Sequence, residues 1–246
     1  MSKKYYKKLR PELEEIIRFL KKDEIKNCSH IGFIYNYEIT SLKKISNSII
    51  LKGTSDRPWV YISCKNNEEL NLLLNETSTY DKCFAVIEDW MMPAFLERFK
   101  LKWKLSVSKY VFENKVESKS LNSIVIPLKT NDAEYIYLNS KYKDYLSVEY
   151  IKERIENGIC AGIYLENKLA AWAITQDDNA IGFLNVLDEH RGKGFAKQII
   201  DYMISKVREA GLIPFAYIEE SNLPAIKLVK KIGFKKNNNV HWFEVE

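Results

Sequence analysis

One stretch constrains the fold of this chain more than any other: residues 184–197, which read LNVLDEHRGKGFAK. It passes from an apolar run typical of a β-strand, through a turn that contains Gly192 and Gly194, straight into an amphipathic helical pattern. Glycine allows the backbone to come close to a ligand, and the free amides at a helix N-terminus attract anions. The stretch therefore predicts a strand–loop–helix unit that binds an anionic phosphate group.

Two common phosphate-binding motifs do not fit this loop. A dinucleotide site has the pattern G-x-G-x-x-G, and the sixth position counted from Gly192 is Lys197 rather than glycine. The nucleotide pattern G-x-x-x-x-G-K-[ST] is absent from the sequence. The loop does match the pattern R-x-x-G-x-[GA], through residues 191–196. The residues downstream of the loop decide which phosphate ligand is meant.

A second motif lies at residues 222–234, which read NLPAIKLVKKIGF. It fits the pattern N-x-x-A-x-x-L-Y-x-x-x-G-F except at Val229, where the pattern has tyrosine. A strand pattern over residues 213–220 separates the two motifs. In order and spacing, the pair resembles the acyl-CoA-dependent acyltransferases of the GNAT superfamily. The resemblance implies the GNAT fold, an α/β (α+β) architecture in which helices flank a mixed, twisted sheet.

The C-terminal part also resembles the glycine-N-acyltransferase-like branch of that superfamily, through residues 171–175, 189–196 and 214–218. Degenerate GNAT-like halves precede the acyltransferase domain in that branch, and the N-terminal part alternates strands and helices without either CoA motif. The polar segment 113–120 has the composition of a short linker. We therefore expect an N-terminal α/β domain over residues 1–116 and a GNAT domain over residues 117–246. An equal alternative is that the N-terminal part merely covers apolar surface.

Hydrophobic periodicity, helix caps and turn residues outline the elements of both parts. In the N-terminal part, the expected elements are a helix over 11–22, paired strands at 49–51 and 59–62, a helix over 68–74, a strand over 83–87, a helix over 93–99 and a strand over 103–112. In the C-terminal part, they are a strand over 123–128, a helix after Asn131, a helix from Ser147 to Gly158, strands near 160–165, 169–176 and 181–186, helices over 195–210 and 223–232, and a strand over 240–245.

Composition argues against several other functions. The formal net charge is +5, from 38 Lys and Arg against 33 Asp and Glu, but the two signs alternate instead of gathering as nucleic-acid binding requires. No apolar run has the length of a membrane span or a signal peptide, so a cytoplasmic protein that binds no membrane is expected. The four cysteines lack C-x-x-C spacing and only three histidines accompany them, so neither a metal site nor a disulfide is predicted. A homodimer is left open.

The resemblance assigns the CoA site to the two motifs. The strand end at Val186 and Leu187 would pair its backbone with the pantetheine arm, and amides near Leu187 would stabilise an oxyanion. Asn222 would contact the cofactor and also cap the helix that begins after it. An ordinary turn and a plain buried strand end are the alternatives. The predicted cofactor-binding residues are Val186, Leu187, Arg191, Gly192, Lys193, Gly194, Phe195, Ala196, Lys197, Asn222 and Ala225.

The same resemblance implies that an amine attacks the thioester of an acyl-CoA, with acetyl-CoA expected, directly within a ternary complex. An amine with a pKa of about 10 is protonated at neutral pH, so a carboxylate has to take its proton. Asp178 and Glu220 are the candidate bases, although adjacent acids in a hairpin usually form turns. Tyr217 or a water molecule is the candidate proton donor to the departing thiolate, because Val229 replaces the usual tyrosine.

Two functions from different classes are consistent with these residues. The first is an N-acyltransferase whose acceptor is an amine of a small molecule or an amino acid. The second is a module that binds CoA or acyl-CoA without turnover, in which Val229 marks lost catalysis. Both share the cofactor loop, so only turnover separates them.

Overall fold

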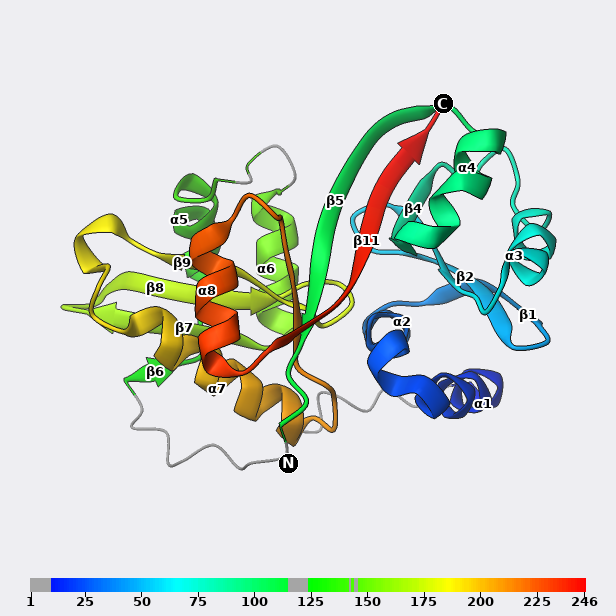
Figure 1. Ribbon diagram of the computed structural model, residues 1–246. Helices are drawn as coiled ribbons and strands as arrows, with labels where there is room; N and C mark the ends of the chain where they lie inside the picture. The colour runs from blue at the N-terminus through cyan, green and yellow to red at the C-terminus, as the bar shows by residue number, and fades with distance from the viewer. Residues whose placement is uncertain (1–9, 115–123, 142, 144–145) are drawn as a thin grey trace.

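Strands and helices are interspersed along the chain, and a run of three strands occurs both before and after residue 115 (Figure 1). The computed structural model describes residues 10–114, 124–141, 143 and 146–246. Before residue 115, the elements are α1 (Pro11–Leu20), α2 (Glu24–Asn36), β1 (Ile39–Ile45), β2 (Ser48–Thr54), β3 (Pro58–Ser63), α3 (Asn67–Leu74), β4 (Cys83–Glu88), α4 (Met92–Arg98) and β5 (Leu101–Val111). After residue 123, they are β6 (Val125–Ile126), α5 (Ala133–Leu138), α6 (Val148–Asn157), β7 (Cys160–Leu165), β8 (Lys168–Thr175), β9 (Ile181–Val186), α7 (Phe195–Glu209), β10 (Phe215–Ile218), α8 (Leu223–Ile232) and β11 (Lys235–Val245).

The strands form two sheets within the described residues. One sheet has seven strands in the order β1-β2-β3-β4-β11-β5-β10, and the other has four, in the order β6-β7-β8-β9. We call residues 10–114 the N-terminal half and residues 124–246 the C-terminal half. Figure 1 shows two lobes side by side, with β5 and β11 as long curved strands between them.

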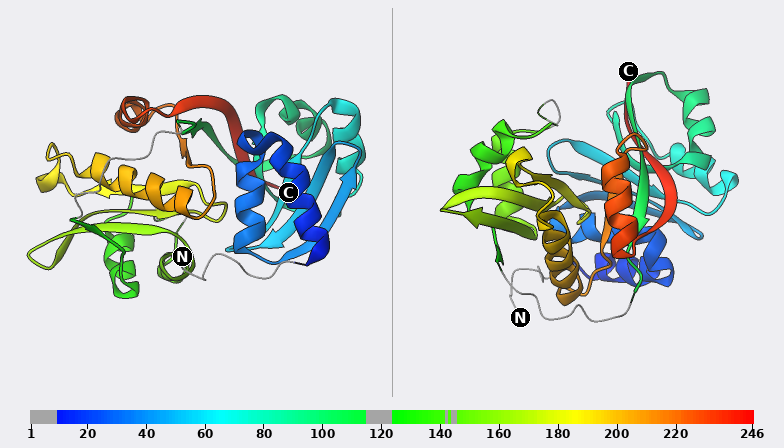
Figure 2. Two further views of the ribbon diagram at one scale, coloured as in Figure 1. Left: turned by 90° about the horizontal axis from the view of Figure 1, so that it is seen from below. Right: turned by 60° about the vertical axis from the view of Figure 1, so that its left-hand side comes forward.

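Each sheet is covered by helices on both faces. In the C-terminal half, the α7 residues Ile199 and Met203 pack with Ala171 and Ala173 of β8, whereas Trp172 of the same strand packs with α5 and α6 on the opposite face. This alternation follows from the period of two along a strand. Figure 2 (left) shows α7 on one face of the four-stranded sheet and the green helices α5 and α6 on the other. In the N-terminal half, α1 and α2 cover one face, and α3 and α4 cover the other.

Local signals explain why the helices begin and end where they do. Ser147 caps α6, because its hydroxyl accepts a hydrogen bond from the amide of Tyr150 at 3.0 Å, and Gly158 comes directly after the last helical residue. In α7, the buried residues recur every three or four positions, which gives the helix one apolar face. Gly233, with φ +115°, ends α8 in the left-handed conformation that favours glycine.

Most of the expected elements occur, with ends that differ by a few residues, but α2 and β1 were not expected. Cys28, Ser29, His30 and Ile31 of α2 are successive residues that are all buried. A helix that is enclosed on every side has no polar face, so its sequence carries no period of 3.6. The last strand also begins five residues earlier than expected, at Lys235, through a polar run that does not read as a strand.

The two halves exchange their last strands. β11, from the C-terminal half, lies between β4 and β5 of the N-terminal half and pairs antiparallel with both. β5, in turn, is the strand that pairs with β10. The expected domain boundary between residues 116 and 117 lies outside the described residues and stays a proposal, but the seven-stranded sheet contains strands from both sides of it.

Candidate functional site

The glycine loop joins the end of β9 to the start of α7. Gly192 and Gly194 have φ angles of +78° and +79°, which place both in the left-handed region that side chains disfavour. A Cβ added to either glycine would meet no atom within 4 Å, so the outer side of the loop is open. The requirement for glycine therefore comes from the backbone conformation, and the space beside the loop is free for a ligand.

The first turn of α7 presents unused backbone amides to this space. Gly194 occupies the N-cap position and offers no side chain as a cap, and the first turn contains no acidic residue. The amides of Phe195, Ala196 and Lys197 therefore have no partner within the helix. Together with the positive end of the helix dipole, they form a site for an anion such as phosphate.

The basic side chains of the loop are directed toward neighbours on the protein. The guanidinium of Arg191 lies 2.6 Å from the Asp188 carboxylate, and its Nε approaches the Val186 carbonyl oxygen at 3.4 Å. Lys193 lies 3.2 Å from Nδ1 of His190, and Lys197 forms an ion pair with Asp201. An anion at the loop would therefore meet the backbone amides first, and these partly engaged charges would add a secondary attraction.

Beside the loop, the two sheets separate. β9 belongs to the four-stranded sheet and β10 to the seven-stranded sheet. Residues 182–187 are half-buried, in contrast to residues 169–175 of the central strand β8, which are all buried. β9 also carries a bulge, because Phe183 and Leu184 lie opposite Ala173 alone, and Phe183 has a φ of +51°. Bulges bend a strand and disturb its pairing, which fits the parting of the sheets at this point.

The backbone of β9 presents Val186, and not Leu187, toward β10. The amide of Leu187 donates to the carbonyl of Ala170 at 3.0 Å, so these residues form a hydrogen-bonded pair. The next pair, Val186 and Ala171, is then a non-hydrogen-bonded one, in which the N–H and C=O of Val186 point away from β8. The expected role for Val186 as a strand partner fits this register. An oxyanion donor at the amide of Leu187 does not fit, because that amide is already engaged.

The second motif forms the start of α8. Asn222 caps the helix through its Oδ1, which accepts from the amide of Ala225 at 3.2 Å. Its Nδ2 makes no hydrogen bond among the described residues and stays available to a ligand. Ala225 is half-buried against the apolar cluster of α7 and α8, and Val229 is buried in that cluster. The apolar position of Val229 leaves α8 without a hydroxyl at this point of the motif.

Two of the three candidate catalytic residues lie in contact. The hydroxyl of Tyr217 donates to Oδ2 of Asp178 at 2.7 Å, and it lies 2.6 Å from the hydroxyl of Ser29 on α2. Burial raises the pKa of Asp178 to about 6, even though the bond from Tyr217 acts in the opposite direction. Asp178 is only 2% exposed, whereas Tyr217 is half-buried and packs edge-on against Trp242. Tyr217 is therefore the more exposed member of this hydrogen-bonded pair.

Glu220 lies apart from this pair in its contacts. Its side chain is 70% exposed and forms an ion pair with Lys236 at 3.2 Å. Among the described residues, no hydrogen bond joins it to Asp178 or Tyr217. The structure thus gives the two predicted bases different environments, one buried and one in solvent.

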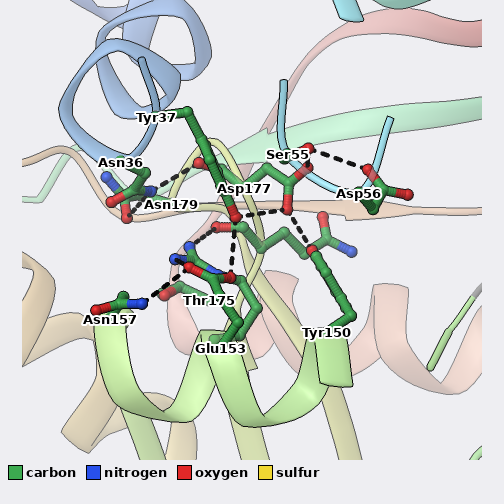
Figure 3. Close-up of polar contacts among 12 residues, drawn as sticks. Asn36, Tyr37, Ser55, Asp56, Tyr150, Glu153, Asn157, Thr175, Asp177 and Asn179 are labelled. Atoms are coloured by element: carbon green, nitrogen blue, oxygen red, sulfur yellow. Dashed lines mark hydrogen bonds and ion pairs between the residues drawn. The ribbon is translucent and has the colours of Figure 1, made fainter. Parts of the chain in front are cut away.

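A further polar cluster surrounds Asp177 and was not expected (Figure 3). Its carboxylate accepts hydrogen bonds from the hydroxyls of Tyr37, Ser55 and Tyr150, and burial raises its pKa. Ser55 and Tyr37 come from the N-terminal half, more than a hundred residues away. The sequence carried one signal for this site, the pair of adjacent acids before β9, but no local pattern identifies their distant partners.

Within the described ranges, no group of three or more His, Cys, Asp or Glu side chains is arranged to hold a metal ion. The four cysteines are buried. In the same part of the chain, no helix combines the length and the apolar character that crossing a membrane requires.

Family comparison covers the region that holds both motifs. A family model described as FR47-like protein matches residues 157–243, from the end of α6 into β11. This range contains the glycine loop, β10 and α8. No curated protein matches the chain in sequence.

Solved structures share the fold of the whole chain. A Drosophila protein superposes with a TM-score of 0.74 at 16% identity and covers 96% of each chain. A GCN5-related N-acetyltransferase from Kribbella flavida gives 0.58 at 11% identity, over 89% of this chain and 94% of its own. A GNAT-family acetyltransferase from Colwellia psychrerythraea gives 0.53 at 16% identity, over 98% and 100%.

These likenesses settle the architecture. The chain has a GNAT fold, a mixed and twisted α/β arrangement flanked by helices, and the fold prediction is confirmed. At such identities the likeness concerns the fold, and the chemistry has to be argued from the site.

Proposed function

We propose that this protein is an N-acyltransferase that moves an acyl group from acyl-CoA, with acetyl-CoA the expected donor, to an amine of a small molecule or an amino acid. One observation carries the proposal. The uncapped N-terminus of α7 lies directly after a half-buried strand edge that no neighbouring strand occupies among the described residues. A cofactor with a phosphate end and an extended, amide-containing arm needs these two features in this order.

Each predicted binding residue has a role in this proposal. The amides of residues 192–197 bind the pyrophosphate, with added attraction from Arg191 and Lys193. Val186, whose N–H and C=O point away from β8, pairs with the pantetheine arm as an extra strand would, and its carbonyl gives up the long 3.4 Å bond from Nε of Arg191. Nδ2 of Asn222 contacts the cofactor, while Ala225 leaves room at the start of α8. Leu187 contributes through its position at the strand end and not through its amide.

Asp178 and Tyr217 handle the protons on this proposal. Amine attack on the thioester needs the loss of a proton from the nitrogen, and a base with a pKa near neutral serves best. The pKa of Asp178 is raised to about 6 by burial. The Tyr217 hydroxyl, which already donates to Asp178, would relay the proton, and it or a water molecule would return one to the departing thiolate. Glu220 is the weaker base, because it is held in solvent by Lys236.

The N-terminal half is proposed to be a degenerate GNAT-like half over residues 1–116, as in the glycine-N-acyltransferase-like branch, with the acyltransferase domain over 117–246. The order β3-α3-β4-α4-β5 supports this proposal, because it repeats the order β9-α7-β10-α8-β11 of the C-terminal half. This half would form a wall of the acceptor site. We expect the enzyme to act in the cytoplasm, without a metal and without nucleic acid.

Two measurements on the purified full chain test the proposed function. Calorimetry with acetyl-CoA tests cofactor binding, and release of free thiol in the presence of a panel of amines tests turnover. We expect saturable binding and amine-dependent thiol release. Absence of acetyl-CoA binding at millimolar concentration would overturn the proposal.

A second candidate function is supported by Val229. Because this residue is buried in an apolar cluster, α8 supplies no hydroxyl for the thiolate. The protein would then bind acyl-CoA without transferring the acyl group. Tight binding combined with no thiol release across primary amines, amino acids and polyamines would favour this function.

A further inference from the structure

The bulge in β9 is a strained point that other residues have to hold. Phe183 adopts a φ of +51°, a region that a residue with a bulky side chain rarely occupies. Such a conformation persists only where the surrounding structure determines it. The residues that contact Phe183 therefore belong to the surroundings that keep this backbone conformation.

Tyr150 of α6 is one such contact. Its ring meets the ring of Phe183 edge-on, with centroids 6.2 Å apart and an angle of 80° between the planes. Its hydroxyl donates to the carboxylate of Asp177, in the turn that leads into β9. One half-buried side chain thus contacts both the strained residue and the turn before the strand.

The same turn is attached to the N-terminal half (Figure 3). Ser55 donates to the carboxylate of Asp177, and the Tyr37 hydroxyl lies 3.3 Å from that carboxylate and 3.1 Å from the carboxylate of Glu153 on α6, so its one proton is shared between them. The side-chain amide of Asn36 donates to the Asp177 carbonyl at 2.6 Å and to Oδ1 of Asn179 at 2.9 Å. Asp177 is therefore a junction at which groups from two distant parts of the chain meet.

Close packing reinforces this attachment. A Cβ on Gly32 of α2 would lie 1.9 Å from the carbonyl oxygen of Asp178, so α2 rests directly on the turn. On the other side, the guanidinium of Arg154 donates to the carbonyl of Gln176 at 3.1 Å. The turn over residues 176–179 is thus in contact with α2 on one side and with α6 on the other.

We propose that Asp177 and Tyr150 are positioning residues through which the N-terminal half holds the bulge of β9. The chain of contacts runs from Ser55 and Tyr37 to Asp177, then to Tyr150, and ends at Phe183. The inference deepens the proposed function and rests on it in one respect, namely that the edge of β9 receives the acyl-CoA arm.

A network that only joins the two halves would behave differently. Its loss would lower the stability of the whole protein and increase local opening everywhere to a similar extent. A positioning network that acts on β9 raises opening there first. Hydrogen exchange of the ligand-free protein separates the two, and it does not depend on CoA.

The experiment compares amide exchange in residues 181–187 with exchange in β2, a buried strand of the N-terminal half. The variants are Tyr150→Leu, Tyr150→Phe and Ser55→Ala, and the matched controls are Tyr135→Phe and Ser41→Ala. The controls remove hydroxyls that make no hydrogen bond among the described residues. We expect exchange in residues 181–187 to rise about tenfold in Tyr150→Leu and about threefold in Tyr150→Phe and Ser55→Ala, with β2 and both controls unchanged. Unchanged exchange in β9, or an equal rise in β2, would overturn the inference.

Acetyl-CoA affinity gives a second readout on the same proteins. We expect Ser55→Ala and Tyr150→Phe each to weaken binding about threefold. The double variant should weaken binding less than the product of the two, because both act through Asp177. If the wild-type protein does not bind acetyl-CoA, the proposed function fails, whereas the exchange result still decides whether the N-terminal half holds β9. If exchange rises but affinity is unchanged, the link from β9 to the cofactor is wrong.

Discussion

The two halves repeat one order of elements but differ at the point where a cofactor would enter. In the N-terminal half, β3 and β4 pair in parallel, with Trp59 opposite Cys83 and Tyr61 opposite Ala85. In the C-terminal half, the corresponding β9 and β10 lie in different sheets. A closed parallel pair has no free backbone groups between its strands, so only the C-terminal half can accept an extended arm as an additional partner.

The N-termini of the corresponding helices α3 and α7 also differ, again in a way that favours a ligand in the C-terminal half. The side chain of Asn66 caps α3 by accepting from the amide of Glu69 at 2.8 Å, and Glu68 and Glu69 place negative charge in the first turn. α7 begins instead after Gly194, with no capping side chain and no acid in its first turn. A capped, acidic helix start repels phosphate, and an uncapped one attracts it. The C-terminal half, where we propose the cofactor site, thus differs from the N-terminal half in two features: its strands β9 and β10 lie apart, and its helix α7 lacks a capping side chain.

The largest expected effect comes from separating the halves. Residues 124–246 expressed alone would lose two strands, β4 and β5, which are the neighbours of β11, and β5 is also the partner of β10. We expect no cooperative thermal unfolding from this fragment by circular dichroism. Co-expression with residues 10–114 as a second chain should restore it, because that chain supplies both missing strands.

A folded fragment with native affinity for acetyl-CoA would contradict this expectation. It would mean that β11 takes the place of β5 beside β10, so that the C-terminal half is complete without the exchange. The comparison of the halves would then describe two independent units.

The second-largest effect is expected from replacing the buried carboxylate of Asp178. If Asp178 is the base of the C-terminal half, Asp178→Asn should lower turnover by roughly 10²–10⁴-fold while the affinity for acetyl-CoA is kept. Wild-type turnover should rise with pH through about 6, where the Asp178 carboxyl loses its proton. Equal turnover of Asp178→Asn and the wild type across pH would place the base elsewhere.

The same variant, Asp178→Asn, is expected to lower turnover but to raise the stability of the fold at neutral pH. Because the folded-state pKa of Asp178 is raised above its unfolded value, the protonated form stabilises the fold at low pH, and this contribution is lost as pH rises through about 6. The cost at neutral pH is about 3 kcal/mol for a shift of this size. Asp178→Asn should therefore unfold at a higher denaturant concentration at pH 7 and show less change between pH 4 and pH 7. Glu134→Gln, which alters an exposed carboxylate, is the control.

A substitution in the glycine loop tests whether the N-terminus of α7, unlike that of α3, binds phosphate. Gly194→Glu places a carboxylate beside the expected phosphate, where two like charges about 4 Å apart repel by about 1–4 kcal/mol. We expect acetyl-CoA affinity to fall at least about tenfold by calorimetry, since a factor of ten corresponds to about 1.4 kcal/mol. Gly211→Glu is the matched control, because Gly211 also has a positive φ, of +70°, and open space around it. Equal affinity of both variants and the wild type would contradict a phosphate site at α7.

Local patterns account for what the sequence predicted well. The glycine turn, the cap at Asn222 and the apolar stripe of α7 each depend on residues close together in the chain. Features that depend on residues far apart in the chain could not be predicted in this way. The exchange of β5 and β11, the contact of Ser55 with Asp177 and the engagement of the Leu187 amide by Ala170 depend on which distant strands and turns meet. Asp178 and Tyr217 were both candidates from their positions, but their bond appears only once the turn before β9 packs against β10.

The smallest effect is expected from replacing Glu220. This replacement tests the contrast between the buried carboxylate of Asp178 and the exposed carboxylate of Glu220. Its side chain is 70% exposed and pairs with Lys236, whose side chain is 45% exposed, at 3.2 Å. Exposed ion pairs contribute about 0.2–1 kcal/mol, so Glu220→Gln should change the free energy of unfolding by less than about 1 kcal/mol. Turnover should change by less than about threefold, because Asp178 is the proposed base and no hydrogen bond among the described residues joins Glu220 to Asp178 or Tyr217. Lys236→Met removes the other partner of the ion pair and serves as the control for any effect that comes from the pair alone. A large loss of turnover in Glu220→Gln, with Lys236→Met fully active, would transfer the base from the buried Asp178 to the exposed end of β10.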